Sequence, residues 1–133
     1  MRVLAVDFGS KRIGVAVGDT ELKLATPRPN ISASGTLATD ASAIVVEARA
    51  SGAAAVVVGI PGGYEDGRME RICRQLADRI SDHGIPVYLI DESLTSVAAE
   101  ASMAHLKASR RRKLKDSEAA CLILERFFHE AGP

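Results

Sequence analysis

Short, mostly apolar runs alternate along this chain with segments whose apolar residues recur every three or four positions. The short runs predict strands, because they are rich in Val, Ile and Leu and are bounded by polar residues or glycine. The three-to-four spacing predicts amphipathic helices. The predicted strands are 1–6, 13–18, 54–59 and 85–90, with a shorter one at 22–26 that Pro27 and Pro29 would end. The predicted helices are 39–51, 69–81, one from Ser93 or Thr95 to about 105, and 116–129.

The order of these elements predicts an α/β fold. Three consecutive strands come first, and strands then alternate with helices, which favours a mixed five-stranded sheet with helices on both faces. The 133 residues fit a single domain, residues 1–133, and contain neither an internal repeat nor a linker that would divide them.

Composition narrows the class of protein without indicating a function. Hydrophobic residues make up 47% of the chain and aromatic residues only 4%, so the core is expected to consist of Val, Ile, Leu and Ala. Lys plus Arg number 17, as do Asp plus Glu, and this balance does not by itself indicate a nucleic-acid-binding protein. Cys73 and Cys121 are expected to be buried thiols. No apolar run could span a bilayer and no signal peptide precedes Asp7, so we expect a cytoplasmic protein without a membrane partner.

Acidic residues follow the first and the last predicted strands. Asp7 ends the first apolar run, and Asp91 and Glu92 end the last. Ligands of open α/β sheets bind at the carboxyl ends of strands. Asp116 is a further candidate, because it shares one helical stripe with three apolar residues. That stripe continues through Ala120, Ile123 and Phe127.

Each of these carboxylates also has a purely structural interpretation. Asp7 could be a hydrogen-bonded structural group, Asp91 and Glu92 a polar turn before a helix, and Asp116 a partner of the helix dipole. If they converge, they need a cation, because like charges would otherwise raise one another's pKa. Mg²⁺ or Mn²⁺ prefers such oxygen ligands, and two such ions can support hydrolysis of a phosphodiester.

Two groups of cations lie next to these acids in the sequence. Lys11 and Arg12 follow Asp7 in a turn with Gly9 and Ser10. The second group lies in the segment 107–115, which we interpret as a basic link just before Asp116. Its candidate phosphate-binding residues are Arg110, Arg111, Arg112 and Lys113. Such a run is often only a solvated segment, but beside a metal site it favours contacts to a nucleic-acid backbone.

Four segments, taken together, resemble the YqgF (RuvX) family. They are Val6–Asp19 (VDFGSKRIGVAVGD), Val57–Pro61 (VVGIP), Asp91–Ser96 (DESLTS) and Lys115–Leu124 (KDSEAACLIL). The resemblance implies an RNase H-like, RuvC-type fold and a divalent-metal nuclease. It also implies that Asp7, Glu92 and Asp116 are the acidic catalytic and metal-binding residues, with Glu92 favoured over Asp91.

The chain departs from the family pattern at three places. Ser93 stands where the family usually has Arg, Ser96 where it usually has Thr, and the loop Gly62–Tyr64 differs from the common form. The loss of an Arg removes a bidentate phosphate contact. None of these changes affects the three carboxylates.

The sequence therefore predicts a metal-dependent nuclease for structured nucleic acid, with processing of the 5′ end of precursor 16S rRNA as the leading hypothesis. The alternatives are a Holliday junction resolvase for branched DNA, which needs a two-fold dimer, and a non-catalytic RNA-binding factor of ribosome assembly. An actin-like or sugar-kinase ATPase also shares the motif at 7–19, but needs two such domains. The sequence does not decide whether the substrate is RNA or DNA, how it is cleaved, or whether the protein is a monomer or a homodimer.

Overall fold

The computed structural model describes residues 1–61, 67–91 and 108–131, with the backbone alone for 108–117 and 131. The strands are β1 (Arg2–Phe8), β2 (Arg12–Asp19), β3 (Leu24–Ser32), β4 (Ala55–Ile60) and β5 (Val87–Asp91). The helices are α1 (Leu37–Ala50), α2 (Arg68–Ser81) and α4 (Ala108–Ala131). The five strands form one sheet in the order β3-β2-β1-β4-β5. β1 is antiparallel to β2 and parallel to β4, so the predicted mixed sheet is confirmed.

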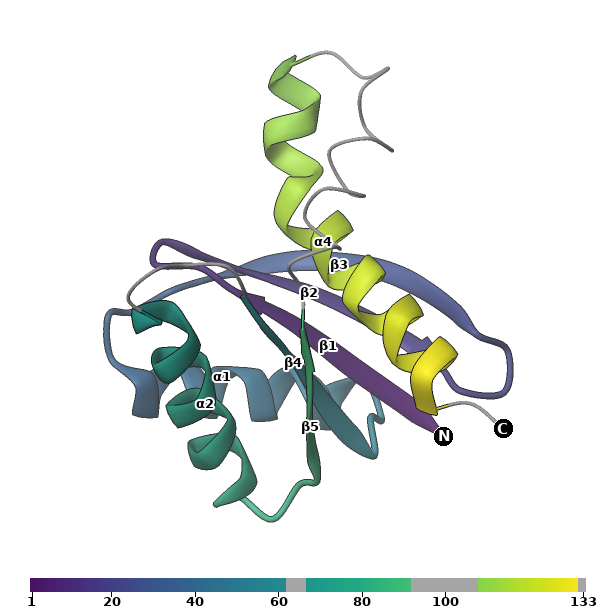
Figure 1. Ribbon diagram of the computed structural model, residues 1–133, viewed down its shortest axis with the longest axis horizontal. Helices are drawn as coiled ribbons and strands as arrows, with labels where there is room; N and C mark the ends of the chain where they lie inside the picture. Colours follow the sequence, from purple (N-terminus) through teal and green to yellow (C-terminus); the bar gives the residue numbers. More distant parts are fainter. Residues whose placement is uncertain (62–66, 92–107, 132–133) are drawn as a thin grey trace.

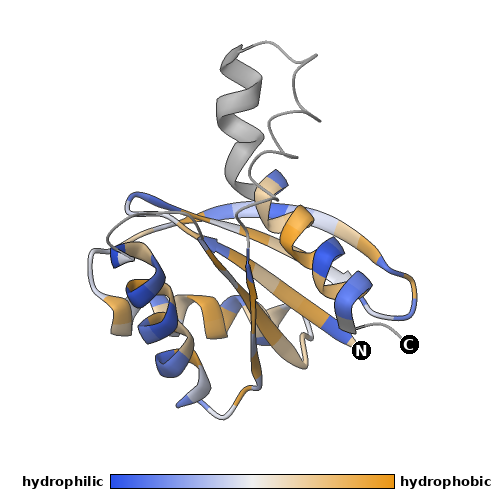
Figure 2. Cartoon of the chain, viewed as in Figure 1, coloured by the Kyte–Doolittle hydropathy of each residue, from blue (hydrophilic) through white to orange (hydrophobic). Residues whose placement is uncertain are grey.

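The sheet has a helical layer on each face (Figure 1), with α1 and α2 on one side and α4 on the other. Alternate residues of β1 belong to the two layers. Leu4 and Val6 lie in the core beneath α1 and α2, and Val3 and Ala5 lie in the core beneath α4. Because both faces of β1 are buried, its sequence is a continuous apolar run. Figure 2 shows the result as hydrophobic colouring along the central strands and hydrophilic colouring over much of α2.

The helical stripe predicted for the end of the chain packs on the sheet. Ala120, Ile123 and Phe127 are all at most 4% exposed and belong to the α4-side core. The ring of Phe127 lies 5.3 Å from that of Tyr88 on β5, centroid to centroid. The three apolar members of the stripe are therefore confirmed as core residues.

The third strand is longer than predicted. β3 runs from Leu24 to Ser32, so Pro27 and Pro29 lie inside it rather than after it. β3 is an edge strand, paired only with β2. Half of the N–H positions of an edge strand point away from its neighbour, so proline can occupy them without loss of a ladder hydrogen bond.

The last helix also begins earlier than predicted. α4 starts at Ala108, so the basic segment that we interpreted as a link is mostly helical backbone. Arg and Lys have high helix propensity, and neither Gly nor Pro occurs between 108 and 131. Among the described residues, no helix is long and apolar enough to cross a membrane.

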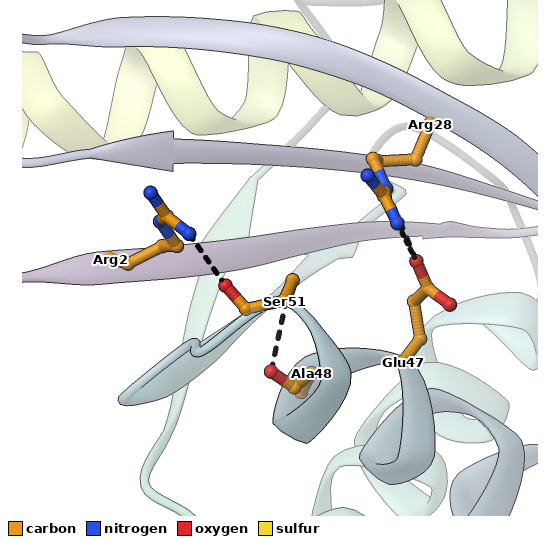
Figure 3. Close-up of polar contacts among 5 residues, drawn as sticks. All are labelled: Arg2, Arg28, Glu47, Ala48 and Ser51. Carbon is orange, nitrogen blue, oxygen red and sulfur yellow. Dashed lines mark hydrogen bonds and ion pairs between the residues drawn. The ribbon is translucent and has the colours of Figure 1, made fainter.

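Two arginines tie the sheet to the α1 layer (Figure 3). Arg2 donates a hydrogen bond of 2.9 Å to the carbonyl of Ser51, just after α1. Arg28 of β3 donates to Oε1 of Glu47 on α1 at 3.0 Å. Since both side chains of the second pair are partly exposed to solvent, the pair adds only about 1 kcal/mol or less to stability.

Both thiols are buried, as the sequence predicted. Burial raises the pKa of Cys121 to about 12, with smaller contributions from the carboxylates of Glu118 and Glu125. An unfolded thiol has a pKa of about 8.5, so the folded state holds its proton more tightly. The contribution of this thiol to stability is therefore complete below about pH 8.5 and is lost as the pH rises toward 12.

We expect the native protein to be almost inert to a thiol reagent at pH 8, because Cys73 and Cys121 are inaccessible and Cys121 stays protonated. Absorbance titration with an aromatic disulfide should count both thiols only after unfolding in urea. Rapid reaction of a native thiol would contradict this prediction.

Candidate active site

Asp7 lies near the carboxyl end of β1, on the face of the sheet that α4 covers. Residues two apart on a strand lie on the same face of the sheet, so Asp7 shares a face with Val3 and Ala5, which belong to the α4-side core. Its side chain is neither fully buried nor fully exposed. The parallel strands β1, β4 and β5 bring their carboxyl ends to one edge of the sheet. Asp7 thus occupies the position where ligands bind in open α/β sheets.

Asp91 reaches the same edge but belongs to the opposite face. It pairs with Ile60 of β4, which lies in the core beneath α1 and α2. Its neighbour Ile90 lies in the α4-side core instead. Because successive residues of a strand point to opposite faces, Asp91 projects away from the face of Asp7. Glu92 lies outside the described residues, and its role as an acid stays a prediction.

Glycines flank Asp7 on both neighbouring strands. Gly14 of β2 is paired directly with Asp7. The register of β1 with β4 runs from Val3 to Val6, the latter beside Val58, so Gly59 is the next β4 residue beside Asp7. Both glycines are buried. Neither has a positive φ, so the backbone does not require glycine there. Sequence reasoning missed this arrangement, because only the register shows which residues are neighbours.

Asp116 belongs to α4, but not to its first turn. It lies about two helical turns after Ala108, so an interaction with the helix N-terminus does not explain it. The α4 residues that follow Asp116 pack on β1 and β2, the strands that carry Asp7 and Gly14. The side chain of Asp116 is not described, so its convergence with Asp7 stays a prediction.

The two predicted cations beside Asp7 are exposed. Lys11 lies in the turn between β1 and β2, and Arg12 begins β2. The turn is tight at Gly9, because a Cβ there would come within 2.6 Å of the carbonyl oxygen of Arg12. The other predicted cations, Arg110, Arg111, Arg112 and Lys113, lie on α4 with only their backbone described.

The described part of the chain contains no cluster of three His, Cys, Asp or Glu side chains that could hold a metal ion. This result covers Asp7 and Asp91 but not Glu92 or the side chain of Asp116. The family departures at Gly62–Tyr64, Ser93 and Ser96 also lie outside the described residues.

Residues 1–130 match the model of the RuvX family, described as Holliday junction resolvase. Curated relatives carry the name "Putative pre-16S rRNA nuclease". The one from Frankia casuarinae is 37% identical over 92% of this chain and 63% of its own length. Those from Opitutus terrae and Anaeromyxobacter sp. are 36% and 37% identical and align over 94% and 100% of their lengths. This chain thus spans less than two thirds of the Frankia protein and nearly all of the other two.

Among solved structures, RuvC of Thermus thermophilus in complex with a Holliday junction substrate aligns with a TM-score of 0.61. The alignment covers 98% of this chain and 95% of that chain, at 16% identity. A second Thermus thermophilus RuvC structure aligns with a TM-score of 0.57. At this identity the likeness concerns the fold alone, and it confirms the RuvC-like fold class expected from the sequence.

Proposed function

Because the chain belongs to the RuvX family, we propose that it is a divalent-metal nuclease that hydrolyses phosphodiester bonds in structured nucleic acid. We propose precursor 16S rRNA as its substrate, following the names of its curated relatives. We propose the cytoplasm as its location, on the expectation drawn from the sequence. The observation that supports this most directly is the position of Asp7 at the carboxyl edge of the sheet, on the face of α4.

The proposed acids are Asp7, Glu92 and Asp116. Carboxylate oxygens are the ligands that Mg²⁺ and Mn²⁺ prefer, so the chemistry of this donor set fits such an ion. When bound, the metal would supply Lewis-acid stabilisation of the charge that develops during attack of water on phosphorus. Asp91 projects to the face of the sheet opposite Asp7, which argues against Asp91 as an acid of this site, and the family resemblance implies Glu92 instead.

The chain's own cations would bind the nucleic acid on either side of the bond that is cleaved. Lys11 lies in the turn that begins two residues after Asp7, Arg12 is the first residue of β2, and both are exposed. The cations at 110–113 lie on α4 before Asp116, at the spacing of one to two helical turns. Phosphate contacts of this kind position the backbone without reading its sequence.

A cleavage assay tests the proposal. Purified protein is incubated with a precursor 16S rRNA fragment and with a four-way DNA junction, each with Mg²⁺, with Mn²⁺ or with EDTA. We expect metal-dependent cleavage of the RNA. Symmetric cleavage of the junction alone, together with a solution mass of a homodimer, would support the resolvase instead. Binding of the RNA without cleavage under any metal condition would support a non-catalytic assembly factor.

The glycines beside Asp7 give a further prediction. If the space beside Asp7 is kept for a metal ion and a phosphate oxygen, an added Cβ meets no packed side chain. Alanine is favoured over glycine inside a strand by about 0.5–1 kcal/mol, so Gly14→Ala or Gly59→Ala should then leave the thermal unfolding temperature unchanged or higher. The same variants should lower cleavage by about tenfold or more, because the methyl group occupies the space of the bound groups. Loss of stability in both variants would instead assign these glycines to packing.

A further inference from the structure

One charged side chain is buried among the described residues. Asp40 is 2% exposed, in the first turn of α1. Its Oδ1 accepts a hydrogen bond of 2.8 Å from the backbone N–H of Ser34. The N-cap residue of α1 is Thr36, whose side chain makes no capping hydrogen bond. The carboxylate of Asp40 therefore holds the segment that precedes the helix. Burial of a carboxylate costs free energy, so the burial of Asp40 calls for a compensating role.

The segment held by Asp40 is hydrogen-bonded to the loop between β1 and β2. The N–H of Ala33 donates a hydrogen bond of 3.0 Å to the carbonyl of Lys11. Ser32, the last residue of β3, is paired with Arg12. Ala33 itself packs against the core beneath α1 and α2. A continuous chain of contacts thus runs from Asp40 through Ser34 and Ala33 to the turn that carries Lys11 and Arg12.

We propose that Asp40 is a positioning residue for the nucleic-acid contacts of Lys11 and Arg12. It does not touch the substrate; it fixes the segment 33–36, which supports the backbone of Lys11. Cations on a fixed turn lose less conformational freedom when they bind phosphate, so the rigid turn strengthens substrate binding. This inference rests on the proposed function, because it assigns these cations to nucleic acid.

The test compares Asp40→Ala with Asp40→Asn. Asparagine keeps the size of the side chain and the Oδ1 acceptor, whereas alanine removes both. We expect Asp40→Ala to raise KM and the Kd for a nucleic-acid duplex several-fold while kcat changes by less than about twofold. We expect Asp40→Asn to restore both constants. The slope of log K against log salt should become shallower by about 1 to 2 in the alanine variant, since each phosphate contact contributes about 0.9 on B-form DNA.

A comparison of combined variants tests whether Asp40 affects KM through Lys11 and Arg12. With Lys11 and Arg12 both replaced by alanine, Asp40→Ala should raise KM no further, because the contacts that it positions are already absent. Ala33→Pro removes the N–H that supports Lys11 without changing Asp40, and it should raise KM in the same way. This second variant serves if Asp40→Ala fails to fold.

One result would overturn the proposal. If Asp40→Ala and Ala33→Pro both lower the unfolding temperature but leave KM and the salt slope unchanged, Asp40 has a purely structural role. Failure of the proposed function is a different result, because the wild-type protein would then neither cleave nor bind the nucleic acid.

Discussion

Asp7→Asn is expected to lower metal-dependent cleavage by about a thousandfold or more while the protein keeps its fold. Asparagine has the same shape but lacks the negative charge that would hold a divalent cation. Loss of one preorganised electrostatic contact commonly costs about 10²–10³ in rate, and loss of a metal ligand should cost at least as much. Single-turnover cleavage with saturating Mn²⁺, beside circular dichroism of the same sample, measures both effects.

Asp91→Asn is the matched control, because it makes the same chemical change at the same edge of the sheet. Asp91 projects to the face opposite Asp7, so its cleavage rate should stay within about threefold of wild type, whereas Glu92→Gln should resemble Asp7→Asn. Full activity of Asp7→Asn in a clean preparation would refute the assignment of Asp7. Inactivity of Asp91→Asn with an active Glu92→Gln would exchange the roles of these two residues.

Gly18→Ala is expected to destabilise the fold by about 3 kcal/mol or more, because overpacking of a filled core costs about 1–3 kcal/mol even where side chains can move. A Cβ at Gly18 would clash with the carbonyl oxygen of Leu24. It would also lie 2.9 Å from Leu124 Cδ2 and 3.0 Å from Phe128 Cζ. The carbonyl belongs to the backbone and cannot rotate away. Thermal unfolding should show a midpoint roughly 10 °C lower than that of the wild type.

Gly35→Ala is the control for backbone strain. Gly35 has a φ of 88°, and a Cβ there would meet no atom within 4 Å. The cost should be only the strain of an L-residue in the left-handed region, about 1–2 kcal/mol. We therefore expect the glycine with ordinary φ to matter more than the glycine with positive φ. The reverse order of unfolding midpoints would show that Gly18 does not lie against β3 and α4 as described.

The sequence by itself determined most of the elements and one face of the last helix. Periodicity was sufficient for β1, β2, β4 and α2, because buried strands and amphipathic helices repeat their apolar residues at different intervals. It also identified Ala120, Ile123 and Phe127 as core residues, because neighbours on one helix face are fixed by local geometry. Asp7 could also be selected from the sequence, because it is an acid at the end of an apolar run that predicts a buried strand.

Tertiary structure decided the remaining features, since they depend on contacts between distant segments. The prolines of β3 are tolerated because that strand lies at the edge of the sheet, and no local pattern shows which strand is at the edge. Asp91 was separated from Asp7 by strand register, which also placed Gly14 and Gly59 beside Asp7. The buried position of Asp40 and its contact with Ser34, six residues earlier, appear only in the folded chain. Local sequence fixes the direction of a side chain within its own element, but only pairing and packing decide what lies beside it.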